Sequence, residues 1–251
     1  MVDEEMGPRQ RGAETKRRRT RELIIVSTLE LYDGKTEGDY TRDEIAAAAG
    51  VGVATVHNNF GSKYEVLRAA YDRLLSPLVD TILEASKQRV YKPSDGVDEL
   101  LRYVYTIAKV SHENRALTVG MIRAYFDLSE DDLPYIPDSE DDLTEEEGRR
   151  FVDTVLGGKI VQGLFVILGT EAFPGNSLGD DRKQYSGSLP TIFLYADALL
   201  MKVYHRKGDG VPVEITRDIC TALLAVCLPE DDWSNIMVRI EAVKELVDRR
   251  A

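Results

Sequence analysis

Apolar residues recur every three to four positions along most of the chain, which is the spacing of one face of an α-helix. No stretch alternates apolar and polar residues between turn signals, as a half-buried strand does. The pattern therefore predicts an all-α fold. The expected helices cover residues 15–34, 42–50, 53–59, 62–89, 95–112, 113–128, 146–170, 188–207, 213–228 and 231–249.

Two of the expected helices are apolar on nearly all sides. They are GKIVQGLFVILG, residues 158–169, and LPTIFLYADALLMKVY, residues 189–204. A helix with so little polar surface is buried on more than one side, either in a large core or at an oligomer interface. The last expected helix, within 231–249, is amphipathic and is expected to lie as a lid on the body of the protein.

A pair of short helices is predicted near residue 50. Thr41 and Glu44 have the spacing of a capping box, which begins a helix that ends near Gly50. A second helix follows after Gly52. Two helices of this length, joined by a tight glycine-containing turn, are typical of a helix-turn-helix.

The second short helix has two different faces. Val53, Val56 and Phe60 share one side, and we expect that side to face inward. The opposite side carries small and amide side chains: Ala54, Thr55 and Asn58, with His57 and Asn59 on its flanks. Such a face can enter a DNA major groove, where an amide bonds adenine and a methyl group meets thymine. The same spacing fits a helical hairpin in an ordinary α-bundle equally well.

Charge is distributed unevenly along the chain. The formal net charge of −12 argues weakly against a nucleic-acid partner. Residues 9–21, however, hold seven basic residues and one acid, whereas residues 127–147 hold eleven acids and no Lys or Arg. Screening removes the influence of distant charges beyond about 8–10 Å, so a local basic patch still attracts phosphate. A solvated tail at 9–21 and a solvated acidic loop at 127–147 are the simpler interpretations.

The sequence offers little support for other classes of protein. The three histidines are far apart, and no nucleophile, phosphate-loop or dinucleotide motif is present, so we do not expect an enzyme, a cofactor or a metal. The acids of 127–147 lack the spacing of a calcium loop. Cys220 and Cys227 cannot form a disulfide framework, which favours a cytoplasmic location. No stretch has the length of a membrane span.

Residues 41–63 carry the pattern T-x-x-E-I-A-x-x-A-G-V-x-x-x-T-V-x-x-x-F-x-S-K. This pattern resembles the N-terminal domain of the tetracycline-repressor (TetR) family of transcription regulators, and the resemblance covers about residues 16–75. It implies a flexible arm at 1–15, a DNA-binding domain at 16–75 and a helical ligand-sensing and dimerisation domain at 76–251. The remainder of the chain resembles the family only in being helical.

The resemblance also implies a function and a set of contacts. It implies a cytoplasmic, homodimeric, one-component regulator, a repressor rather than an activator, which binds a palindromic operator in double-stranded DNA and is released by a small-molecule effector. The residues at positions that contact DNA in the family are Thr41, Arg42, Val53, Ala54, Thr55, His57, Asn58, Asn59 and Lys63. The alternative is a ligand- or protein-binding module of the same fold that does not bind DNA, which the overall acidity favours.

Two positions depart from the pattern of the family. His57 stands where a tyrosine is usual, and Gly52 stands where a capping serine is common. Glycine is a weaker helix cap, although a permitted one. Neither departure changes the expected fold, but both leave the operator sequence unpredictable.

The effector and the dimer interface are less well defined by the sequence. Candidate pocket residues for a largely apolar effector are Tyr103, His112, Met121, Tyr125, Gln162 and Phe165. Residues of these types at helical spacing are more often part of a core. The helix at 188–207 is expected to pack on the core with one side and on a partner with the other, beside the helix at 213–228. Candidate interface residues are Leu200, Tyr204 and Leu224.

Overall fold

The computed structural model describes residues 8–35, 37–86, 93–132, 154–168, 189–228 and 233–249. Within these ranges the chain forms ten α-helices, one 3-10 turn and no strand, which confirms the all-α fold. The helices are α1 (Pro8–Tyr32), α2 (Arg42–Ala48), α3 (Val53–Asn59), α4 (Lys63–Ser86), α5 (Pro93–Glu113), α6 (Arg115–Phe126), α8 (Gly158–Leu168), α10 (Leu189–His205), α11 (Val211–Cys227) and α12 (Ile236–Asp248). The 3-10 turn is Glu130–Asp132.

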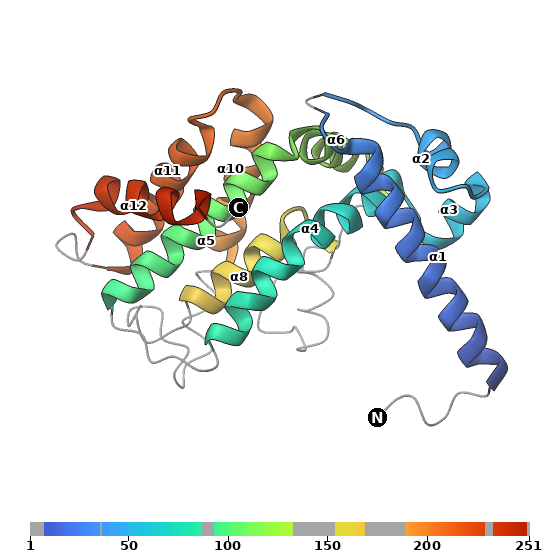
Figure 1. Cartoon of the computed structure of the whole chain (residues 1–251), viewed down its shortest axis with the longest axis horizontal. Helices are drawn as coiled ribbons and strands as arrows, with labels where there is room; N and C mark the ends of the chain where they lie inside the picture. The colour runs from blue at the N-terminus through green and yellow to red at the C-terminus, as the bar shows by residue number, and fades with distance from the viewer. Residues whose placement is uncertain are drawn as a thin grey trace.

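Helices α1 to α3 lie at one end of the molecule, and α4 leads from them into the remaining helices (Figure 1). We call α1 to α3 the helix-turn-helix unit, and α5 to α12 the bundle. Helix α4 packs against α1 at one end and against α6 and α8 in the bundle. Helix α5 packs against α8, α11 and α12. One hydrophobic core extends from the helix-turn-helix unit into the bundle. Helix α4 belongs to this core along its length and connects the two parts.

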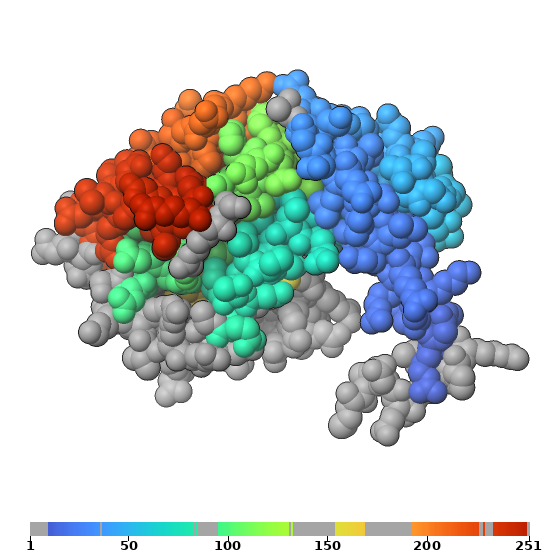
Figure 2. All heavy atoms as spheres, viewed as in Figure 1, coloured from blue at the N-terminus to red at the C-terminus, as the bar shows by residue number. Residues whose placement is uncertain are grey.

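Helix α1 is longer than the sequence led us to expect. It begins at Pro8, so residues 8–15 continue the helix, where we expected a flexible arm. Its second half packs through Ile24, Ile25 and Tyr32, whereas residues 10–19 are exposed and project from the body (Figure 2). Helix-favouring residues such as Arg11 and Lys16 extend the helix into solvent.

The bundle buries most of α8 and a smaller part of α10, the two helices that are apolar on nearly all sides. Seven of the eleven residues of α8 are buried, as expected for a helix enclosed by others. Helix α10 buries Ile192, Ala196 and Leu199, but Leu194 on another side is 66% exposed. Most of the acidic segment 127–147 lies outside the described residues. No helix in the described ranges is long and apolar enough to cross a membrane.

Candidate nucleic-acid interface

The first short helix begins with the expected capping box. The backbone N–H of Glu44 donates to Thr41 Oγ1 at 3.3 Å, and the backbone N–H of Thr41 donates to Glu44 Oε2 at 2.8 Å. The hydrogen bond from the Thr41 backbone to the carboxylate lowers the pKa of Glu44. Together the two bonds satisfy two backbone donors that the helix start would otherwise leave free. Ile45 and Ala46 then face the core. Arg42 is exposed beside the cap, where it can reach a phosphate.

The turn between α2 and α3 depends on a glycine. Gly50 has a φ of 63°, a left-handed conformation that glycine adopts without steric cost. The backbone N–H of Val51 closes the turn by donating to the carbonyl of Ala46 at 3.0 Å. Helix α3 then begins at Gly52 without a side-chain cap, as expected from the missing serine. The rotation of α3 is therefore fixed by packing rather than by its cap.

Two buried side chains determine which face of α3 points outward. Val56 is fully buried, and Phe60 is 1% exposed, so the opposite face carries Ala54, His57 and Asn58 to the surface. Val53 was expected to face inward, but it is 42% exposed. Helix α3 contacts the core through Val56 and Phe60, which are one and two turns after Val53. Val53, at the start of the helix, lies outside this contact. Val53 thereby joins the outer face.

The side chain of Asn59 turns back onto its own helix. Its Nδ2 donates to the carbonyl of Thr55 at 2.8 Å, and the residue is half-buried. Its Oδ1 is buried and has no hydrogen-bond partner among the described residues. Asn59 is therefore less free to reach a base edge than Asn58, which is exposed. Thr55 is also half-buried, at the edge of the outer face.

Arg21 from the basic run holds α1 against the end of α3. Its guanidinium lies 3.9 Å from the centre of the Phe60 ring and donates to the backbone carbonyl of Asn59. Burial lowers the pKa of Arg21, with a smaller opposing effect from Glu65. Arg21 is thus a packing residue, a role that the sequence analysis missed. The exposed basic side chains of residues 16–19 lie on the projecting half of α1, where they can contact phosphate.

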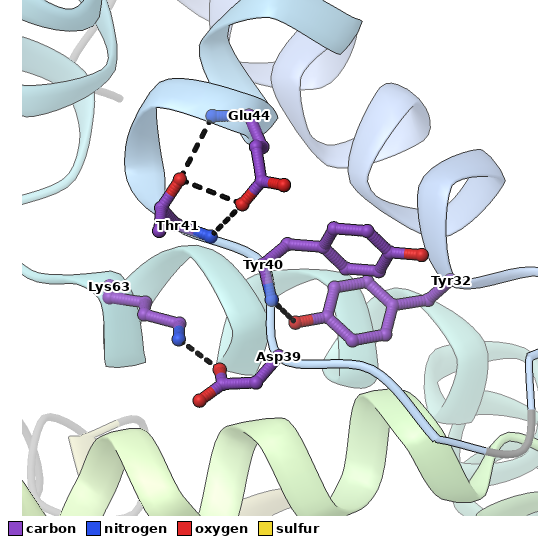
Figure 3. A network of polar contacts seen from close by, with 6 residues as sticks. All are labelled: Tyr32, Asp39, Tyr40, Thr41, Glu44 and Lys63. Atoms are coloured by element: carbon purple, nitrogen blue, oxygen red, sulfur yellow. Dashed lines mark hydrogen bonds and ion pairs between the residues drawn. The ribbon is translucent and has the colours of Figure 1, made fainter.

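Lys63 begins α4 beside the helix-turn-helix unit and forms an ion pair with Asp39 (Figure 3). The loop that carries Asp39 is held by aromatic packing. The rings of Tyr32 and Tyr40 meet edge to face at 4.9 Å, and the N–H of Tyr40 donates to the Tyr32 hydroxyl at 3.4 Å. The carboxylate of Asp39 therefore occupies a position at Lys63 where a DNA phosphate could bind. Sequence reasoning did not identify this partner.

The candidate effector residues do not form one site. Met121 is fully buried, and the hydroxyl of Tyr103 donates to the carbonyl of Ile160 at 3.0 Å in the core. Gln162 accepts a hydrogen bond from Lys159 on the surface of α8, where Phe165 is also half-buried. The other two candidates are Tyr125, one turn after Met121 on α6, and His112 on α5.

Tyr125 and His112 lie in two different surroundings. The ring of Tyr125 packs 5.1 Å from that of Tyr64, near the start of α4. Asp197 lies near both rings, and its burial raises its pKa to about 6. His112 instead lines a cavity between the helix-turn-helix unit and the bundle, which none of the other five candidates lines. Neither Asp197 nor the cavity was expected from the sequence.

The candidate interface residues are partly inside the protomer. Leu200 and Leu224 are fully buried in the core, so neither presents a surface to a second copy. Tyr204 is half-buried, and its ring lies 5.9 Å from the guanidinium of Arg123. The open side of α10 is instead the one that carries Leu194.

No family model matches the chain, and no curated protein matches it. Two solved structures resemble its fold. A TetR transcriptional regulator from Rhodococcus sp. RHA1 is 17% identical, with 84% of this chain and 97% of that chain covered and a TM-score of 0.51. FadR of Thermus thermophilus, a TetR-family transcriptional repressor solved with lauroyl-CoA, is 21% identical, with 83% and 95% covered and a TM-score of 0.53. The chain thus has the all-helical fold of TetR-family transcriptional regulators.

Proposed function

We propose that this protein is a member of the TetR family and a ligand-responsive repressor that binds a palindromic operator as a homodimer in the cytoplasm. The observation that carries the proposal is the geometry of α3. Buried Val56 and Phe60 fix the helix so that Ala54, His57 and Asn58 face outward, and the first turn of α4 places Lys63 beside it. A reading face with a cation at its edge is what a helix-turn-helix needs.

The side chains of the reading face suit the major groove. The amide of Asn58 can bond an adenine edge with two hydrogen bonds, and the methyl groups of Val53 and Ala54 can meet thymine methyls. His57 can donate to a base or to a phosphate. Thr41, Arg42 and Lys63 surround this face and would bind phosphates, which sets the position of the protein on DNA without reading sequence.

The net charge of −12 does not prevent such binding. DNA phosphates meet only the local surface, because charges farther away than about 8–10 Å are screened at physiological ionic strength. The exposed basic side chains of residues 16–19 lie at the same end of the molecule as α3 (Figure 1). They would add affinity for any sequence rather than specificity.

Helix α4 is the part through which an effector would act. The hydroxyl of Tyr64, in its first turn, donates to the carbonyl of Thr154 at 3.1 Å, just before α8. Farther along, the hydroxyls of Tyr71 and Ser111 are hydrogen-bonded at 2.7 Å in the core. A ligand that displaces α8 would therefore move the start of α4 and change the separation of the two reading helices. Because α8 and α10 are largely apolar, we expect a largely apolar effector.

A palindromic operator needs two copies related by a two-fold axis. The side of α10 that carries Leu194 is the best candidate for the contact, because Leu194 is 66% exposed and Met201 is half-buried on the same helix. Packing of α10 and α11 against their symmetry mates would cover this surface. A self-complementary apolar face of this kind is typical of homodimers.

The proposal is tested by DNA binding to the region upstream of the protein's own gene, measured by fluorescence anisotropy against random DNA of equal length. His57→Ala and Asn58→Ala should lower the ratio of specific to non-specific affinity, each by about 1–3 kcal/mol if the contact is bidentate. Asn59→Ala should lower it less, because that amide is bonded to Thr55. Equal binding to both DNAs by the unchanged protein would instead favour a module that does not regulate transcription.

A further inference from the structure

A cavity of about 330 Å³, lined mainly by charged residues, lies where the helix-turn-helix unit meets the bundle. Three segments form it: the turn after α1, the junction of α5 and α6, and the turn between α10 and α11. Figure 2 shows the first and third of these segments side by side at the upper edge of the molecule. The lining residues are Lys35, Glu37, His112, Glu113, Arg115, Lys207 and Gly208.

The carboxylate of Glu37, although largely exposed, lies near three cations at this cavity. It forms an ion pair with Lys207, and Arg115 and Arg123 attract it from α6. The pKa of Glu37 is accordingly lowered, chiefly by its hydrogen bond with Lys207. The chain thus places one of its own carboxylates in a cluster of basic side chains.

One of the cations, Arg115, is held in place independently of Glu37. The guanidinium of Arg115 donates to the carbonyl of Tyr204 at 2.8 Å, which fixes its direction. Lys35 also lines the cavity and forms no ion pair within the described part of the chain. The second acid of the cavity, Glu113, is 3.7 Å from Lys109, whose closer partner is Asp248 at 2.6 Å, so Glu113 is only partly compensated. Lys35, Arg115 and Lys207 nevertheless outnumber it. Removal of Glu37 from the cluster would leave an excess of positive charge.

We propose that this cavity binds a small oxyanion, the phosphate or carboxylate group of a small molecule, in competition with Glu37. The cavity volume is at the low end of the range for ligand pockets, which limits the ligand to the size of a metabolite. Lys35 and Lys207 would bind the charge. Arg115, already fixed by backbone carbonyls, would direct it with little loss of side-chain entropy.

The same loop connects this cavity to the proposed DNA-binding face. Glu37 pairs with Lys207 of the bundle, and two residues later Asp39 pairs with Lys63. An anion that displaces Glu37 would release the loop on the bundle side and weaken the constraint that holds Asp39 against Lys63. This consequence for DNA rests on the proposed function, whereas anion binding does not.

The test is calorimetric titration of the full-length protein with inorganic phosphate and, separately, with citrate, at ionic strength matched with chloride. Lys207→Gln should weaken binding about three-fold, because the energy of one exposed ion pair is lost. Glu37→Gln should strengthen binding about three-fold, because the competing carboxylate is gone. Opposite signs for the two variants of one ion pair distinguish competition from a general loss of structure.

Two controls separate the cavity from other effects. Asp33→Asn removes the same charge from an exposed residue that does not line the cavity, and should leave affinity unchanged. Lys16→Gln, on the exposed half of α1, removes a cation outside the cavity and should also leave it unchanged. A Glu37→Gln effect no larger than that of Asp33→Asn would overturn the proposal, as would a loss of binding in Lys16→Gln as large as that in Lys207→Gln. Because no DNA is present, failure of DNA binding would leave this result unaffected.

Discussion

In the helix-turn-helix unit, helices begin and end through residues that are neighbours in sequence, whereas in the bundle they are fixed by residues that are far apart. Thr41 and Glu44 begin α2 three residues apart. In the bundle, by contrast, Tyr103 bonds to Ile160 across 57 positions. Local pairs can be recognised from spacing, but distant pairs are known only once the chain is folded. The two regions therefore differ in how directly their residues reveal a role.

The difference can be tested first on α10, where the largest effect is expected. Leu200→Asp would place an unpaired charge in the fully buried core, which costs several kcal/mol and should abolish cooperative unfolding of a native state. Leu194→Asp, on the exposed side of the same helix, should leave the melting temperature nearly unchanged but convert a dimer to a monomer. Circular dichroism and light scattering measure both. A dimer that persists in Leu194→Asp would move the interface, with exposed Val238 on α12 as the next candidate.

Substitution of two glycines, one in the bundle and one in the helix-turn-helix unit, tests the same difference in packing. A Cβ at Gly163 in α8 would overlap the hydroxyl and ring of buried Tyr103, so Gly163→Ala should cost about 1–3 kcal/mol by overpacking. At Gly12 in the exposed half of α1, a Cβ meets nothing within 4 Å, and alanine favours the helix. Thermal unfolding should show a loss for Gly163→Ala and none for Gly12→Ala. A loss in both would mean that the first half of α1 packs on another part of the protein.

Much of the helix-turn-helix unit was predictable because its determinants are local. The capping box at Thr41, the end of the first short helix near Gly50 and the inward-facing pair of Val56 and Phe60 all follow from local spacing. The exposure of Val53 was not predictable, because periodicity shows which residues share a face but not where the packing contact ends.

The roles that the sequence did not reveal depend on distant partners. Asp39 meets Lys63 across 24 positions, and nothing in either local pattern indicates this pair. In α10, apolar residues cover several sides, so periodicity could not decide whether Leu200 or Leu194 faces a partner. Tertiary packing made that choice by burying Leu200 completely. Tertiary packing likewise places His112 at a cavity that none of the other candidate effector residues lines.

A smaller effect is expected at the ion pair of Lys63 and Asp39. Lys63→Gln should weaken binding to operator and random DNA alike and lower the slope of log affinity against log salt by about one unit. Asp39→Asn should act in the opposite direction, because it frees Lys63 for phosphate. Anisotropy titrations at several salt concentrations measure both slopes. An unchanged slope in Lys63→Gln would mean that Lys63 does not contact phosphate.

The smallest expected effect concerns Asp197 in α10. Its half-buried carboxylate lies near Tyr64 and Tyr125, and burial alone raises its pKa from 3.8 to about 6. The folded protein therefore binds the carboxyl proton of Asp197 more tightly than the unfolded chain does. Ionisation of the group costs stability, and that cost develops as the pH rises from about 4 to about 6 and persists above it.

Asp197→Asn removes the ionisable group and should therefore stabilise the protein at pH 7.5 but leave it unchanged at pH 4. A full shift of about two pKa units corresponds to about 3 kcal/mol, but solvent screens a partly exposed carboxylate, so about 1 kcal/mol is expected. For a chain of this size that corresponds to about 2–4 °C in melting temperature. Asp33→Asn, at an exposed position, serves as the control and should leave the melting temperature unchanged at both pH values. A lower melting temperature for Asp197→Asn at pH 7.5 would mean that the ionised carboxylate is stabilised in the fold, contrary to its surroundings.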